Sequence, residues 1–301
     1  MIIETLSTFP DMYESVMGAS MMRIAQEKGI LDFKAHDLRD WTHDRHRTTD
    51  DEPYGGGDGL VMKCAPIFEA YESLCGAPCG GPDAVDRASG EGSADAAGQM
   101  PGDSSDAAQT PGEGSDSAAV EQALSAASAA ADQAASKPYT IFLAPQGRRF
   151  DDASACELAK QDRLLFICGH YEGIDERAYT LADEVISLGD YVLTSGELAS
   201  MVVIDAVVRK LPGVLGAETG ALGESFADGL LEYPQYTRPA NFNGMEVPAV
   251  LLSGNHGAVD RWRREQSLER TYRLRPDLLE GMELPDADRA FLQSLSTEEQ
   301  Q

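Results

Sequence analysis

Basic residues are scarce in this sequence of 301 residues. Lys and Arg number 24 against 51 Asp and Glu, which gives a formal net charge of −27. Such a balance argues against a protein that coats DNA or binds anionic membranes non-specifically. It does not exclude nucleic acid, because binding needs only a local basic face. No apolar run approaches the roughly 18 residues that a membrane helix needs, so we expect neither DNA nor a membrane as a partner.

Cysteine is also rare. The five cysteines are an odd number and no two form a C-x-x-C pair, so the chain is not a small scaffold held by disulfides. The amino terminus, MIIETLSTFP, lacks the charged start and apolar core of a secretory signal. We therefore expect a cytoplasmic protein with reduced thiols. Its composition, 42% hydrophobic and 25% charged, is typical of a globular chain with about two domains.

Large residues are nearly absent between residues 76 and 137. Ala, Ser, Gly, Asp and Pro dominate this segment, and its ten acidic residues outnumber two basic ones, a net charge of −8. Too little apolar surface is available to offset the entropy of ordering the chain. We predict a disordered acidic insertion within a domain, with a folded module as the alternative.

Short apolar runs alternate with helical patterns on either side of this segment. We predict buried strands at residues 1–9, 139–145, 163–170 and 184–193, and helices at residues 11–27, 66–74, 151–161 and 196–210. Strands separated by helices imply parallel pairing with helices on both faces, which is the α/β class. From residue 226 onward the pattern is mainly helical.

Each predicted strand after the insertion ends in a loop that contains glycine. The loops are PQGRR at residues 145–149, GHYEGIDER at 169–177 and LGDY at 188–191. In an open α/β sheet, ligands bind beyond the carboxyl ends of the strands. Glycine lets backbone amides and carbonyls approach a ligand closely, which suits adenine and ribose. We predict a pocket between these loops; ordinary turn glycines are the alternative.

Familiar nucleotide motifs are missing. Residues 54–59 (YGGGDG) have neither the G-x-G-x-x-G spacing of a dinucleotide fold nor the Lys-Ser/Thr of a P-loop. Residues 43–47 (HDRHR) combine two imidazoles with two guanidiniums, and the adjacent positive charge disfavours a metal ion. We favour contact with RNA or substrate there over metal ligation, and we predict no metal ligands in the sequence.

A series of strings, in order along the chain, resembles the TrmD family of tRNA (guanine-N1)-methyltransferases. They cover nearly everything outside residues 76–137 and read THDRHRTTDD, PYGGG, LAPQGRR, CGHYEGIDER, SLGDYVL, LPGVLG, YTRP and VLLSGNH. The resemblance implies methylation by S-adenosylmethionine of N1 of the guanine immediately 3′ of the anticodon in tRNA. It also implies a SPOUT-class fold, a parallel-sheet domain with a deep trefoil knot. Periodicity alone would not suggest a knot.

The resemblance further implies a domain plan and a homodimer. Residues 1–215 would form the catalytic domain that binds S-adenosylmethionine, interrupted by the insertion at 76–137. Residues 216–226 would be a flexible linker and residues 227–301 a smaller, mainly helical tRNA-binding domain. The predicted helix at 196–210 is apolar around most of its circumference and requires burial on several sides, which a subunit interface would provide. Family members are associated with Mg²⁺ dependence, although the sequence has no dedicated ligand cluster.

Three charged residues correspond to catalytic positions of the family. Glu224 would accept the proton of the target guanine, Arg209 would be its electrostatic partner, and Glu172 would contact the guanine. Glu224 stands where the family has Asp, but a carboxylate remains. The alternatives are an ordinary i, i+4 ion pair between Arg209 and Asp205, and a solvated loop acid at Glu172.

Cofactor contact is implied for the loops that contain glycine. The residues concerned are Leu143, Pro145, Gly169, Tyr171, Leu188, Gly189, Asp190, Tyr191, Val192, Leu193 and Gly196. Nearby, Ser195 replaces a usual Gly and Ala199 a usual Pro, and a positive φ at Ser195 would add strain. These departures motivate a second hypothesis, a catalytically silent RNA-binding dimer. A small-molecule methyltransferase of the same fold would not explain the Arg-rich C-terminal segment.

Two basic segments are candidates for tRNA contact. Residues 261–275 contain six Arg against two Glu, and on a helix several guanidiniums could meet an RNA backbone with paired hydrogen bonds. A solvated helix surface is the alternative. The resemblance places residues 43–47 at the anticodon loop. The predicted tRNA-binding residues are His43, Arg45, His46, Arg47, Arg261 and Arg264.

Overall fold

The computed structural model describes residues 1–76, 137–216 and 223–298. The chain divides into two compact units, one comprising Met1–Phe150 and Glu157–Asp205, the other Asp151–Cys156 and Ala206–Gln301. Most of the predicted insertion at 76–137 and of the predicted linker at 216–226 lies outside the described residues. Among the described helices, none combines the length and apolar character needed to cross a bilayer.

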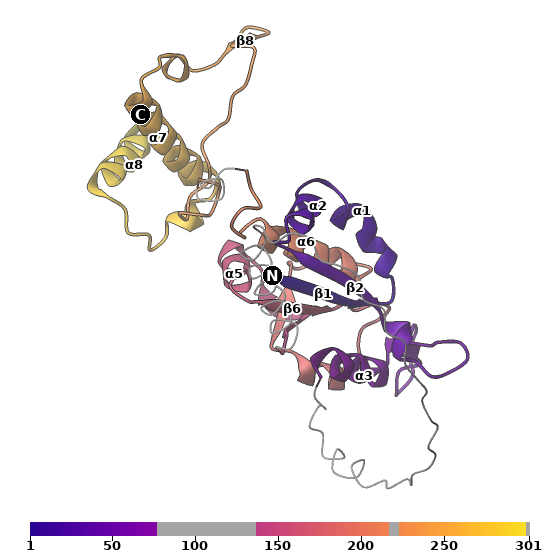
Figure 1. The fold of residues 1–301 in the computed structure, drawn as a ribbon. Helices are drawn as coiled ribbons and strands as arrows, with labels where there is room; N and C mark the ends of the chain where they lie inside the picture. The colour runs from indigo at the N-terminus through magenta and orange to yellow at the C-terminus, as the bar shows by residue number, and fades with distance from the viewer. Residues whose placement is uncertain (77–136, 217–222, 299–301) are drawn as a thin grey trace, which may run out of the picture. The chain divides into compact units, whose positions relative to one another are not determined.

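The first unit contains a five-stranded sheet in which every pair of strands is parallel (Figure 1). The strands lie in the order β2 (Asp32–Asp37), β1 (Ile2–Ser7), β6 (Arg163–Ile167), β5 (Tyr139–Arg149) and β7 (Glu184–Ser187). The helices α1 (Glu14–Met17), α2 (Ser20–Glu27) and α6 (Gly196–Val208) cover one face, and α3 (Cys64–Cys75) covers the other. The predicted α/β class is confirmed.

Smaller elements connect these layers. They are η1 (Pro10–Tyr13), η2 (Leu38–Trp41), β3 (Asp50–Asp51), β4 (Val61–Met62), α5 (Asp152–Leu158) and η3 (Glu176–Leu181). On the α3 side of the sheet, Leu6, Phe142 and Ile167 pack with Ile67 and Tyr71 of that helix. The central strands are buried on both faces, so their sequences read as continuous apolar runs.

Three local features differ from the predictions. Strand β2 was not expected; it is an edge strand with the polar sequence DFKAHD, and charged side chains are common at sheet edges. The strand predicted at 184–193 ends at Ser187, and Gly189, with φ 149°, turns the chain. The helix predicted at 11–27 is divided into η1, α1 and α2, with Gly18 at the end of α1.

A buried ionic group joins the three strands β2, β1 and β6. The Glu4 carboxylate accepts hydrogen bonds from His36 Nε2 at 2.9 Å and from Arg163 Nε at 2.7 Å. Arg163 also donates to the Leu74 carbonyl at 3.0 Å. Burial alone would raise the pKa of Glu4, but the bonds from His36 and Arg163 outweigh it and hold that pKa below its ordinary value.

We expect Glu4→Gln to lower the free energy of unfolding of this unit by about 3 kcal/mol, because it leaves the buried guanidinium without its counter-charge. Since the pKa of Glu4 is lowered by folding, its stabilisation is complete above the ordinary value of 4.5 and is lost as pH falls through the folded value. The variant should therefore lose less stability than the wild type between about pH 5 and pH 3.

Urea unfolding followed by Trp41 fluorescence in a Trp262→Phe background measures this effect. The Trp41 ring lies 6.1 Å from that of His36, so its emission reports on this region. Glu14→Gln, at an exposed position of α1, is the control and should change stability by less than about 0.5 kcal/mol. Equal effects of the two substitutions would show that the buried group does not stabilise the sheet.

The second unit is mainly helical. It contains α7 (His256–Leu274) and α8 (Asp286–Glu298), the turns η4 (Ala249–Leu252) and η5 (Pro276–Leu279), and a short hairpin of β8 (Asn241–Phe242) and β9 (Met245–Glu246). Its buried apolar residues include Leu230, Leu268 of α7 and Leu295 of α8. The hairpin was not predicted, because strands of two residues are too short to show alternation.

Candidate active site

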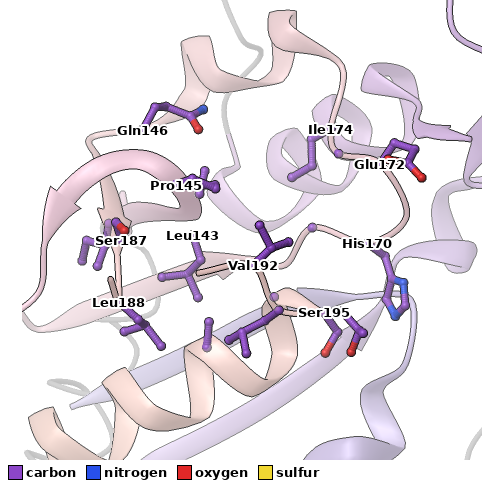
Figure 2. A pocket seen from close by; sticks show the side chains of 18 of the residues that line it. Leu143, Pro145, Gln146, His170, Glu172, Ile174, Ser187, Leu188, Val192 and Ser195 are labelled. Atoms are coloured by element: carbon purple, nitrogen blue, oxygen red, sulfur yellow. The ribbon is translucent and has the colours of Figure 1, made fainter. Parts of the chain in front are cut away.

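A bend within β5 and the loops that follow β6 and β7 meet around a cavity of about 540 Å³ (Figure 2). The segment at 145–149, predicted as a loop after a strand, is instead the last part of β5. Ten of the eleven residues predicted for cofactor contact line it, and Asp190 does not. The ten are Leu143, Pro145, Gly169, Tyr171, Leu188, Gly189, Tyr191, Val192, Leu193 and Gly196. Gln146, His170, Ile174 and Ser187 also line the cavity without having been predicted. Gln146, His170 and Ser187 each lie next to a predicted residue, which is the signal that could have identified them, whereas Ile174 lies two positions after Glu172.

One wall of the cavity is a bend in β5. Ile186 of β7 is paired both with Leu143 and with Arg148, so the residues between these two arch away from the sheet. Gly147 stands against the backbone of β7, where an added Cβ would lie 2.6 Å from Ile186 N. Only glycine permits this close approach.

Two further glycines, Gly169 and Gly196, pack against each other at the floor of the cavity. Gly196, the first residue of α6, donates its N–H to the carbonyl of Gly169 at 2.7 Å. A Cβ at Gly196 would lie 2.6 Å from Gly169 N and 2.9 Å from Cys168 Cα, and both are backbone atoms. Ser195, the residue before, is not among the residues with positive φ. The replacement of glycine by Ser195 therefore adds no backbone strain of the kind that was expected.

A buried polar network supports this floor. Glu197 is fully buried and accepts a hydrogen bond of 2.5 Å from the Ser7 hydroxyl at the end of β1. Tyr13 lies 2.6 Å from the Ser200 hydroxyl and 3.1 Å from Cys168 Sγ. Burial raises the pKa of Cys168 to about 12, so this thiol stays protonated. The network fixes the ends of β1 and β6 against α6. Its one sequence signal is a glutamate in the first turn of a largely apolar helix.

Glu172 lies on the rim of the cavity, where its loop is hydrogen-bonded to the loop that contains Leu60. Its N–H donates to the Leu60 carbonyl at 3.0 Å, and its side chain borders both the cavity and Gly59. A Cβ on Gly59 would lie 2.4 Å from Glu172 Cγ. The glycine-rich segment at 54–59 thus gives space to the Glu172 side chain. The exposed carboxylate is available to a ligand in the cavity as well as to solvent.

The other two predicted catalytic residues contact each other within the second unit. Arg209 donates from Nη2 to Oε1 of Glu224, and both side chains are partly buried. The alternative partner of Arg209, Asp205, is not used. Fifteen residues separate the two charges, so helical spacing could not have predicted the pair.

The predicted tRNA-binding residues fall into two groups. His43 lies 2.8 Å from Glu69, Arg47 pairs with Asp40, and Arg264 is held by two aspartates. Arg45, His46 and Arg261 have no carboxylate partner among the residues described. In the same part of the chain, no group of three or more His, Cys, Asp or Glu side chains is arranged to hold a metal ion.

Comparison with known proteins finds similarity over nearly the whole chain. The family model described as tRNA (Guanine-1)-methyltransferase TrmD matches residues 1–86 and 106–281. A curated tRNA (guanine-N(1)-)-methyltransferase of Moorella thermoacetica is 43% identical over 99% of this chain and 98% of the relative. Relatives of the same name from Carboxydothermus hydrogenoformans and Shouchella clausii are 43% and 42% identical over 97% and 94% of the chain, and 92% and 93% of their own length. The chain therefore belongs to the TrmD family of tRNA (guanine-N1)-methyltransferases.

Proposed function

We propose that this protein methylates N1 of the guanine immediately 3′ of the anticodon in tRNA, with S-adenosylmethionine as donor. The observation that carries the proposal is the cavity formed by the bend in β5 and the loops after β6 and β7, all of which lie within the residues that the family model matches. The alternative, a catalytically silent RNA-binding dimer, was motivated partly by strain at Ser195. The backbone there has no positive φ, which weakens that alternative.

The cavity suits a nucleoside-containing donor. Its volume of about 540 Å³ falls within the range of roughly 300–1,000 Å³ typical of small-molecule sites. Leu143, Pro145 and Leu193 offer apolar surface to a base, and Gly169 and Gly196 also line the cavity. When bound, S-adenosylmethionine supplies a methyl group attached to a positively charged sulfur.

The remaining chemistry belongs to the protein. Guanine N1 carries a proton that must leave as the nitrogen gains a methyl group, so a base within hydrogen-bond reach is needed. We assign this role to the Glu224 carboxylate. Arg209 holds Glu224 through Nη2 and would stabilise negative charge on guanine O6. Glu172, on the cavity rim, would contact the guanine.

A homodimer would complete the site. Leu198 and Val202 on α6 are 42% and 54% exposed, and Tyr191 and Val192 beside the cavity are exposed as well. Exposed large apolar side chains of this kind are typical of a protein interface. We propose that a second copy of the chain covers it and supplies Arg209 and Glu224 to the partner's cavity, in a cytoplasmic enzyme. Arg45, His46 and Arg261 would contact the tRNA.

The proposal is tested by mapping the methylated nucleoside. We expect a tRNA transcript with guanine 3′ of the anticodon, incubated with protein and donor, to yield 1-methylguanosine at that position by mass spectrometry. A transcript with adenine there should remain unmodified. Binding of both donor and tRNA without any methylation would instead favour the silent RNA-binding dimer.

A further inference from the structure

The loop that follows β6 borders the cavity and has an unusual backbone. Figure 2 shows His170 and Glu172 on this loop. Between them, Tyr171 has a φ of 60°, and Gly173 follows with a φ of 145°. A residue other than glycine keeps a positive φ only where the surrounding structure holds it there. The positions of Tyr171 and Glu172 therefore depend on bonds from outside the loop.

The segment at residues 60–62, which includes β4, supplies these bonds. Besides the bond from Glu172 N–H to the Leu60 carbonyl, Met62 makes two backbone hydrogen bonds with the loop. The Met62 N–H donates to the Gly173 carbonyl at 2.9 Å, and the Met62 carbonyl accepts from Asp175 N–H at 2.9 Å. The far half of the loop is thus fixed by backbone groups, which no substitution of a side chain removes.

The near half of the loop is held by a side chain. The His170 N–H donates a hydrogen bond to Met62 Sδ at 3.1 Å, and Met62 is only 1% exposed. The His170 ring lies 4.7 Å from the ring of Phe9 and 5.2 Å from the ring of Tyr171. A shift of the His170 backbone would therefore change the position of Tyr171, which lines the cavity.

Packing alone does not require sulfur at this position. Met62 lies in the apolar cluster with Leu6, Leu38 and Ile67, where leucine would fill a similar volume. A thioether combines an apolar body with a weak hydrogen-bond acceptor, and leucine has no acceptor. Leaving a buried N–H without an acceptor costs more than the bond itself contributes. Without the sulfur, the His170 N–H would have to move to find another partner.

We propose that Met62 is a positioning residue for methyl transfer, whose sulfur fixes the His170 backbone and through it the neighbouring Tyr171 and Glu172. Met62 does not line the cavity, so it acts only through this loop. The inference rests on the proposed function, in which Glu172 contacts the guanine. It assigns a role in that reaction to a buried methionine of the apolar core.

Met62→Leu tests the proposal, because leucine keeps the apolar bulk and removes the acceptor. We expect the single-turnover rate at saturating donor and tRNA to fall by roughly 10–100-fold, since displacements of about 1 Å in a positioned site cost this much. The affinity for tRNA should not change, and the melting temperature should fall by a few degrees at most. Hydrogen exchange followed by mass spectrometry should show faster exchange in the peptide that contains His170.

Met22→Leu is the matched control. Met22 lies on α2 and is 4% exposed, and among the residues that the structure describes none donates a hydrogen bond to its sulfur. This variant should match the wild type in rate and in hydrogen exchange of the loop.

Two results would overturn the proposal. One is a Met62→Leu protein that equals Met22→Leu in both rate and loop exchange. The other is faster exchange throughout the sheet together with a large fall in melting temperature, which would mean that Met62 only packs. Absence of methylation by the wild type would instead refute the proposed function, and the exchange comparison would still decide whether the sulfur holds the loop.

Discussion

Glu224→Ala is expected to lower the single-turnover rate of methyl transfer by roughly 10²–10⁴-fold, the usual contribution of a positioned general base. The measurement uses enzyme in excess over labelled tRNA, so that product release does not limit the rate. The affinities for tRNA and donor should change little. The Glu224 carboxylate contacts Arg209 and does not line the cavity. Its loss therefore removes a proton acceptor and leaves the residues that line the cavity unchanged.

Two further substitutions separate proton transfer from positioning. Glu224→Gln keeps an oxygen that can accept from Arg209 but cannot take a proton, so it should be as slow as Glu224→Ala. Glu224→Asp restores the residue usual in the family and should lie within about tenfold of the wild-type rate, because the carboxylate is retained. A glutamine variant with nearly normal single-turnover methylation would refute the assignment of the base.

The parts of this fold that could be predicted are those where burial determines the sequence. Strands β1 and β6 are covered on both faces, so their apolar runs identify them. Strand β2 was not predicted because it lies at the edge of the sheet and carries polar residues such as Lys34. The cavity was foreseen because glycines follow successive parallel strands, and the topology brings the ends of such strands together.

Contacts between distant segments could not be predicted in this way. Spacing favours Asp205 as the partner of Arg209, yet the guanidinium binds Glu224 fifteen residues away. The resemblance to the family implied this role, and no periodic pattern encodes it. The same holds for the hydrogen bond between Ser7 and Glu197, which lie 190 positions apart. Nor could composition show that Arg264 is held by Asp228 and Asp288, whereas Arg261 meets no carboxylate in the part of the chain that the structure describes.

Gly196→Ala should weaken donor binding at least roughly 100-fold. The new methyl group would stand 2.6 Å from Gly169 N, so the backbone on one side must move and the 2.7 Å hydrogen bond between the two glycines must break. A displacement of about 1 Å in a positioned site can cost about 10²-fold in rate, and we expect a loss of the same order in donor affinity because both glycines line the cavity. Calorimetry with the donor and with its demethylated product measures the effect. Gly216→Ala, where nothing lies within 4 Å of the added Cβ, should bind normally.

Mixing the Glu224→Ala and Gly196→Ala proteins shows whether the Gly196→Ala protein is inactive only because it fails to fold. If each site combines one protomer's cavity with its partner's Glu224, a mixed dimer contains one site in which both parts are intact. After random exchange, half of the dimers are mixed and each has one working site, so activity should return to about a quarter of the wild-type level. Recovery would require that the Gly196→Ala protomer is folded and supplies its carboxylate across the interface. Absence of any recovery, although both variants dimerise and melt like the wild type, would mean that cavity and base act within one chain.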